Sequence, residues 1–189
     1  MHPIFYALQG LWLMVPAYLP NSAAAFFGGG KPVDFGRNWT DGRRILGDGK
    51  TWRGTIGGIF AGMVIGLVQI GILIPFDTDL LGSFGSDPLQ VGIVLFCLSF
   101  GSMLGDMIGS VYKRRVNLER GAKAPILDQY DFLIGTFLML IIFQRGWLFD
   151  YFIDGLHIIA LITVLVLTWF LHRAVNIIGY KMGKKEVPW

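Results

Sequence analysis

Long apolar stretches alternate with shorter polar segments along the whole chain. The apolar stretches cover approximately residues 4–27, 55–74, 89–112, 128–143 and 156–178. A helix that crosses a membrane needs about 20 mostly apolar residues, so each stretch is a candidate for one. The pattern predicts an all-α, polytopic integral membrane protein with five transmembrane helices, in which residues 1–189 form a single membrane domain.

Composition supports a place in the membrane. Hydrophobic residues make up 53% of the chain and charged residues 15%, whereas a soluble domain carries about 25% charged residues. The mean hydropathy of +0.57 agrees with this. Cys97 is the single cysteine, which excludes an internal disulfide and a cysteine metal site.

The first apolar stretch is predicted to form a helix of the protein, although it contains Pro16 and Pro20. It has neither the basic start nor the cleavage site of a signal peptide. A membrane helix tolerates proline when neighbouring helices supply hydrogen-bond donors to the carbonyl groups that proline frees.

The basic residues predict the orientation. Fifteen of the 16 Lys and Arg residues fall in residues 28–54, in residues 111–127 or in residues 173–185, and residues 77–87 hold none. Because basic loops stay in the cytoplasm, the first two segments are predicted to be cytoplasmic loops. The N-terminus would then lie outside and the C-terminus inside. A basic cytoplasmic face attracts lipid headgroups and phosphates.

Two rows of glycines indicate close helix packing. One row follows the second stretch at positions 54, 58, 62 and 66, and the other follows the third at positions 101, 105 and 109. Glycine rows let helix backbones approach closely. Packing alone explains them, but close helices could also leave a narrow polar cleft at one end, and the rows could serve a homodimer.

Three aspartates lie inside or at the mouth of apolar stretches. Asp106 shares a helix face with Ser110 and Lys113, and Asp128 and Asp131 share a face at the start of the fourth stretch. An ion pair at Asp106 and helix capping by Asp128 are the structural alternatives. An intramembrane acid is costly and is more often functional. Three carboxylates without a histidine cluster favour a hard divalent cation such as Mg²⁺.

Basic side chains near these acids fit two roles. The run from Lys113 to Arg115 is followed by Arg120 and Lys123. They suit either lipid headgroups or the phosphates of a group-transfer reaction.

A second polar set precedes the second stretch. The segment GDGKTWRG places Lys50, Thr51 and Arg53 before a helix N-terminus, which suits an anion, although its spacing is not that of a Walker A motif. The segment FFGGGKPVDFG, residues 26–36, lies upstream of it and is interpreted as a flexible glycine turn.

These motifs resemble those of the CTP-dependent phosphatidate cytidylyltransferases. Gly105-Asp106, Ser110-x-x-Lys113-Arg114 and Asp128-x-x-Asp131 match that family's G-D, S-x-x-K-R and D-R-x-D elements, and GKTWRGTIGG is similar to its K-T-x-x-G segment. The short five-helix form resembles the archaeal branch, the CDP-archaeol synthases. The chain departs from the bacterial pattern where Pro125-Ile126-Leu127 replaces H-G-G and Gln129 replaces arginine.

The resemblance implies transfer of CMP from CTP to an ether-lipid phosphate with Mg²⁺ as cofactor, at the cytoplasmic face of the cell membrane. It implies catalytic roles for Asp106, Lys113, Asp128 and Asp131, with the three aspartates as metal ligands. The phosphate contacts it implies are Lys50, Thr51, Arg53, Ser110, Arg114 and Lys123. The expected partners are CTP, a lipid phosphate and membrane lipids, with no nucleic acid.

Other functions remain open at this point. The substrate could be an ester phosphatidate, and the chain could be an ion- or proton-coupled transporter or a non-catalytic lipid-binding protein. A transporter places its acids near the membrane midplane, whereas these charges gather at one side. A CDP-alcohol phosphotransferase is disfavoured because Asp41-Gly42 is followed by Arg43-Arg44 and not by that family's spacing.

Overall fold

A computed structural model describes residues 2–73, 79–118 and 125–181. The helices of the described part are α1 (Pro3–Phe27), α2 (Trp52–Leu73), α3 (Pro88–Arg115), α4 (Pro125–Phe143), α5 (Arg145–Phe152) and α6 (Ile158–Lys181), with the short 3₁₀ turns η2 (Asp79–Leu81) and η3 (Gly155–His157). The same residues contain only isolated β-bridges and no strand. The all-α prediction is therefore confirmed for the described chain.

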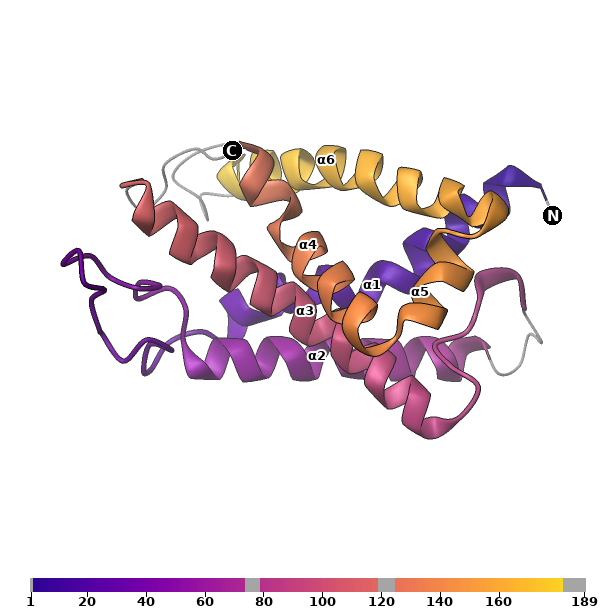
Figure 1. The fold of residues 1–189 in the computed structure, drawn as a ribbon, viewed down its shortest axis with the longest axis horizontal. Coiled ribbons are helices and arrows are strands. Elements are labelled where there is room, and N and C mark those ends of the chain that lie inside the picture. The colour runs from indigo at the N-terminus through magenta and orange to yellow at the C-terminus, as the bar shows by residue number, and fades with distance from the viewer. Residues whose placement is uncertain (1, 74–78, 119–124, 182–189) are drawn as a thin grey trace.

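The long helices form one bundle, in which α1 packs against α2, α3 and α6, and α3 packs against α4 (Figure 1). The N-terminus lies at one end of the bundle, and the segment between α1 and α2 lies at the other. Residues on α1, α3 and α4 such as Leu13, Leu98 and Phe132 are fully buried and form the apolar core. The long helices thus join the two ends of the molecule.

The predicted helix boundaries agree with the structure to within three residues. The prediction was wrong for residues 145–152, which lie between the fourth and fifth predicted helices and were expected to form a loop. In the structure they form the helix α5. A second correction concerns the predicted loop 111–127, since α3 continues through Arg115 and carries the first three basic residues of that segment. The apolar pattern missed α5 because eight residues are too few to span a membrane.

Three described helices are long and apolar enough to cross a membrane, namely Trp52–Leu73, Pro88–Arg115 and Ile126–Phe143. The segments Arg145–Phe152 and Gly155–Leu171 meet at a bend of 83° and together would make a fourth, broken span. The helix α1 does not meet this criterion. The structure thus supports a membrane protein, and the fifth span and the orientation stay predictions.

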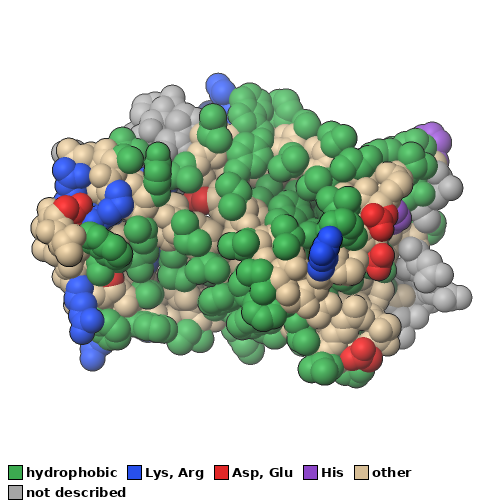
Figure 2. All heavy atoms as spheres, viewed as in Figure 1, with side chains coloured by type: hydrophobic (Ala, Val, Ile, Leu, Met, Phe, Trp, Pro, Cys, Tyr) green, Lys and Arg blue, Asp and Glu red, His purple; other side chains and the backbone are tan. Residues whose placement is uncertain are grey.

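Charged side chains gather at the two ends of the bundle, with a hydrophobic surface between them on the face that Figure 2 shows. Lys and Arg dominate the end that carries residues 28–51, and acidic side chains lie at the other end. Large apolar side chains such as Phe60 and Leu67 are well exposed along the middle. This distribution is expected for a bundle embedded in a membrane, because its middle part is in contact with lipid and not with water.

The two prolines of α1 leave backbone carbonyl groups that other helices satisfy. Pro16 and Pro20 cannot donate to the carbonyl groups four residues earlier, those of Trp12 and Pro16. The buried Gln69 of α2 donates through Nε2 to Trp12 O at 2.9 Å. The buried Ser99 of α3 donates through Oγ to Pro16 O at 3.4 Å. The expectation that neighbouring helices would supply these donors is confirmed.

Both glycine rows pack against neighbouring helices of the same chain. A Cβ atom added at Gly58 would lie 2.6 Å from Pro20 O, and one at Gly62 would lie 2.6 Å from Pro16 O. On α3, a Cβ atom at Gly101 would lie 2.7 Å from Thr136 Cα of α4. The packing interpretation of the rows is confirmed, and a homodimer remains untested.

Replacing Gln69 by leucine should destabilise the bundle, because Trp12 O would lose its donor where no water can replace it. We expect a loss of about 1 kcal/mol in the free energy of unfolding, measured by unfolding in mixed detergent micelles. Val68→Leu is the matched control, because Val68 is exposed on the same helix and should leave the free energy unchanged. An equal effect of the two substitutions would contradict the role of Gln69.

Candidate active site

Asp106 lies on α3 and forms an ion pair with Lys50, which comes from the segment before α2. The side chains of Lys50 and Asp106 are 24% and 21% exposed. A helix residue and a loop residue 56 positions apart in the chain are thus brought together. The ion-pair alternative for Asp106 is what the structure shows, and its partner is one of the predicted phosphate-binding residues.

A second ion pair joins α3 to α4. Lys113 lies two turns beyond Asp106 on α3, and it pairs with Asp128 in the first turn of α4. Because α4 begins at Pro125, Asp128 lies inside the helix and does not occupy the N-cap position. The pair holds the ends of the two helices together at the same side of the bundle.

Asp131 is buried between the two helices, at 6% exposure. Its Oδ1 accepts the backbone N–H of Phe132 at 2.7 Å. It interacts electrostatically with Asp106, Lys113 and Lys50. Asp131 therefore completes a group of five side chains, which we call the acid–lysine cluster: Lys50, Asp106, Lys113, Asp128 and Asp131.

Gly109 makes room for the Asp131 side chain. A Cβ atom at Gly109 would lie 2.6 Å from Asp131 Oδ2 and 3.1 Å from Asp131 Cβ. At Gly105, one turn earlier, an added Cβ atom would overlap the backbone carbonyl of Asp131. The glycine row of α3 thus places Asp131 against α3 and next to the other charges.

A cleft of about 190 Å³ opens beside the cluster. Its lining residues include Asn21 of α1, Lys50 and Thr51 of the segment before α2, Thr55 of α2, and Met103 and Asp106 of α3. The Oδ1 atom of Asn21 is buried there without a hydrogen-bond partner in the described residues. Sequence reasoning missed Asn21, and its carboxamide within an apolar stretch was the signal that could have indicated it.

Two other predicted site residues, Thr51 and Ser110, form hydrogen bonds with backbone groups. The Thr51 hydroxyl accepts the backbone N–H of Gly54 at 3.1 Å and so caps α2 from the wall of the cleft. The Ser110 hydroxyl donates to Asp106 O at 2.9 Å. Both side chains are therefore engaged with backbone groups.

Arg114 donates to Leu118 O at 2.8 Å and lies beside Gly47. Arg53 is exposed beside Gly30 and does not line the cleft. Lys123 lies outside the described residues. Of the predicted phosphate contacts, the structure thus places Lys50 and Thr51 at the cleft.

Within the described ranges, no group of three or more His, Cys, Asp or Glu side chains is close enough to hold a metal ion. The three aspartates therefore do not converge on one metal position in this structure. Asp106 and Asp128 each form an ion pair with a lysine. Asp106 and Asp131 remain close enough to interact electrostatically. Mg²⁺ takes one or two protein carboxylates and completes its shell with water and substrate phosphates, so the oxygen donors of Asp106 and Asp131 are of the kind that this ion prefers.

An apolar helical bundle with a cluster of carboxylates and lysines beside a cleft at one end is typical of an intramembrane enzyme. Its sequence is matched over residues 2–189 by the model of the CarS-like family, described as CDP-archaeol synthase. The chain belongs to this family.

Curated relatives and a solved structure agree. The chain is 48% identical over 176 residues to the CDP-archaeol synthase of Methanospirillum hungatei. It is 49% identical over 176 residues to that of Methanoregula boonei. Each match covers 93% of this chain and 100% of the relative. A solved intramembrane enzyme for archaeal membrane lipid biosynthesis aligns with a TM-score of 0.65 and 32% identity, over 90% of this chain and 94% of that one. The family supports the cytidylyltransferase interpretation over the transporter, phosphotransferase and lipid-binding alternatives.

Replacing Gly109 by alanine should displace the Asp131 carboxylate, because the new Cβ atom would lie too close to Oδ2. We expect turnover to fall by about 10²-fold, measured by steady-state kinetics, while the thermal midpoint changes little because the end of a side chain can move. Gly92→Ala on the same helix is the control, since no atom lies within 4 Å of an added Cβ there. Full activity in Gly109→Ala would show that the position of Asp131 is unimportant.

Proposed function

We propose that this chain transfers CMP from CTP to 2,3-bis-O-geranylgeranylglycerol 1-phosphate, giving a CDP-activated archaeal lipid and pyrophosphate. The observation that carries the proposal is the acid–lysine cluster at one end of a membrane bundle. Membership of the CDP-archaeol synthase family names the reaction.

The reaction is an in-line displacement at the α-phosphorus of CTP. An oxygen of the lipid phosphate attacks, the bond from the α-phosphorus to the bridging oxygen breaks, and pyrophosphate leaves with that electron pair. A phosphate monoester is already a nucleophile near neutral pH, so the protein needs no strong base. Its contribution is positioning and charge neutralisation.

The two lysines of the cluster are suited to exchange partners when the substrates bind. At rest, Lys50 neutralises Asp106 and Lys113 neutralises Asp128. The triphosphate of CTP brings more negative charge than one carboxylate, and its oxygens accept strong hydrogen bonds from ammonium groups. We assign Lys50 and Lys113 to the phosphates of CTP, which leaves the aspartates available to a cation.

Asp106 and Asp131 would hold Mg²⁺, and Asp128 would join them once Lys113 has moved. When bound, the ion neutralises charge on the phosphates as the displacement proceeds. Thr51 can still donate its proton to a phosphate oxygen, because it only accepts from Gly54.

The remaining predicted phosphate contacts keep their assignments as proposals. They are Arg53, Ser110, Arg114 and Lys123. Arg53 must turn from the surface towards the cleft, and the Ser110 proton must leave Asp106 O. Arg114 supports this best among the three that the structure describes, since it lies beside Gly47, in the segment that carries Lys50.

We place the enzyme in the cell membrane as a single five-helix domain, with the cluster on the cytoplasmic side. The concentration of Lys and Arg at the end that holds the cluster supports this orientation. CTP would then enter from the cytoplasm, and the lipid would reach the cleft from the inner leaflet. A homodimer remains a further proposal.

Purified protein in detergent should release pyrophosphate only when CTP, Mg²⁺ and an ether-lipid phosphate are all present. An ester phosphatidate, assayed in parallel, tests lipid selectivity. Asp106→Asn should abolish release, because the carboxylate at the centre of the cluster is lost. Absence of release from folded wild-type protein with either lipid would overturn the proposed function.

Lys50→Met tests the exchange of partners. CTP binding should weaken by about 10- to 100-fold, since a charged hydrogen bond contributes about 1.5–3 kcal/mol. Mn²⁺ binding without nucleotide should become tighter, because Asp106 loses the ammonium group that competes with a cation. Isothermal titration and Mn²⁺ paramagnetic resonance measure the two affinities. Lys31→Met, exposed in the same segment, should change neither, and unchanged Mn²⁺ affinity in Lys50→Met would contradict the exchange.

A further inference from the structure

The segment that carries Lys50 has little regular structure of its own. Residues 28–51 form no helix, and two isolated bridges, Pro32 to Thr51 and Asn38 to Arg44, are their only strand-like pairings. Without further contacts such a segment would not hold a lysine in one place. The contacts that fix it therefore bear directly on the acid–lysine cluster.

A buried carboxylate organises the segment from within. The Asp34 side chain is 1% exposed. Its Oδ1 accepts the N–H of Gly36 at 3.0 Å and Arg44 Nη2 at 2.8 Å. Its Oδ2 accepts the N–H groups of Leu46 at 3.0 Å and Gly47 at 3.1 Å, as well as Arg44 Nε at 3.3 Å. We call these five residues the Asp34 network.

The network stays charged at neutral pH. Burial by itself raises the pKa of the Asp34 carboxyl. The Arg44 guanidinium and the three backbone N–H donors outweigh this effect and hold the pKa well below its usual range. The segment interpreted from the sequence as a flexible glycine turn thus contains a fixed, ionised centre.

The network leads directly to Lys50. Gly47 donates its N–H to Asp34, and its carbonyl accepts the N–H of Lys50 at 3.2 Å. Lys50 O accepts the N–H of Val33, the neighbour of Asp34, at 2.8 Å. The backbone of Lys50 is therefore held on both sides by residues that contact or adjoin Asp34.

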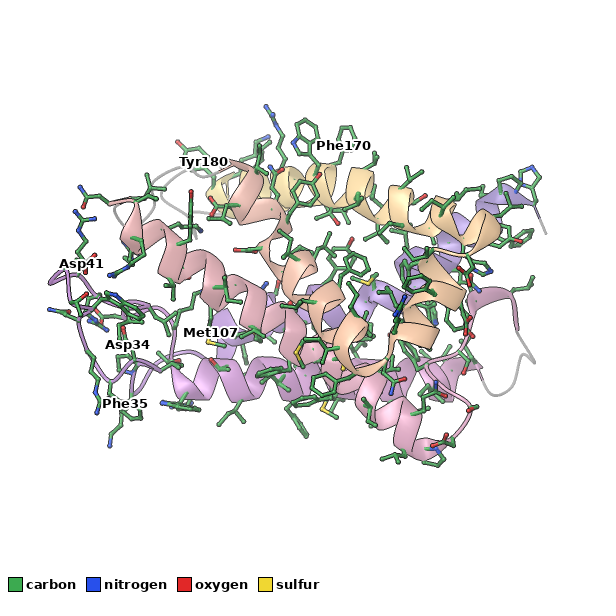
Figure 3. All side chains as sticks on the ribbon, in the orientation of Figure 1. Asp34, Phe35, Asp41, Met107, Phe170 and Tyr180 are labelled. Carbon is green, nitrogen blue, oxygen red and sulfur yellow. The ribbon has the colours of Figure 1, made fainter. Side chains whose placement is uncertain are left out.

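Arg115 ties the same segment to α3. Its Nη1 donates to Asp41 Oδ1 at 2.6 Å, and its Nη2 donates to Arg44 O at 2.7 Å. Its guanidinium also lies over the Trp39 ring, 5.5 Å from the ring centroid. Figure 3 shows Asp34 and Asp41 in this segment, at the end of the molecule where α3 ends. Arg115 thus contacts the segment through a hydrogen-bonded ion pair, a backbone carbonyl and an aromatic ring.

We propose that Asp34 and Arg115 are positioning residues that set Lys50 against Asp106 within the acid–lysine cluster. Arg115 ends the helix that carries Asp106 and Lys113, so it holds the segment in register with the acids. Asp34 shapes the turn from which Lys50 projects. The inference rests on the proposed function, because the role of Lys50 towards CTP gives the positioning its purpose.

A mutant cycle with Lys50→Met tests the proposal. Alone, Asp34→Asn and Arg115→Ala should each lower kcat/KM for CTP by about 10- to 100-fold, mainly through KM, with KM for the lipid phosphate unchanged. In the Lys50→Met background neither should cause a further loss, because both act through Lys50. Arg37→Ala, an exposed arginine of the same segment, is the control and should behave as wild type.

Losses that add in the Lys50→Met background would overturn the positioning role, as would equal effects on both KM values. Asp41→Ala supplies a milder second variant if Asp34→Asn does not fold, since it removes one contact of Arg115 and leaves Asp34 in place. It should raise KM for CTP in the same direction, and an unchanged KM would count against Arg115. The experiment distinguishes the two proposals. Inactive wild-type protein would refute the proposed function. Active wild-type protein whose variants show additive losses would refute only the positioning role.

Discussion

The close approach of α3 and α4 at the glycine row of α3 is the constraint on which the rest of the site depends. At Gly105 the backbone of α3 meets the carbonyl of Asp131, and at Gly109 the missing side chain leaves room for the Asp131 carboxylate. Helices in lipid have no hydrophobic force between them and associate through such close packing. The packing of α3 against α4, which stabilises the bundle, therefore also brings Asp131 close to the other charged side chains of the cluster.

The charges in turn explain how acids persist at the edge of a membrane. An ionised carboxylate in lipid is costly unless a partner compensates it, and Lys50 and Lys113 compensate Asp106 and Asp128 from other elements of the fold. Because each pair joins two elements, it also holds the segment before α2 and the start of α4 in place. Stability at rest and the capacity to bind phosphates therefore depend on the same side chains.

The sequence predicted the parts of this structure that depend on short-range periodicity. Helix boundaries, the glycine rows and the shared face of Asp106 and Lys113 all follow from spacing along a helix. The network around Asp34 could not be predicted, since it joins residues up to 13 positions apart through an irregular backbone. Nor could spacing along the chain predict that Lys50 of that segment would form an ion pair with Asp106, the carboxylate expected to bind a metal.

The prolines of α1 have a consequence for biogenesis. This helix is synthesised first, yet the donors to its freed carbonyl groups come from Gln69 and Ser99 in helices made later. In a membrane helix a hydrogen bond that satisfies such a group contributes about 1 kcal/mol. A nascent chain that ends before Ser99 thus holds its first helix with Pro16 O lacking that donor. The hydrogen bonds of the helix made first are therefore complete only after α3 has joined it.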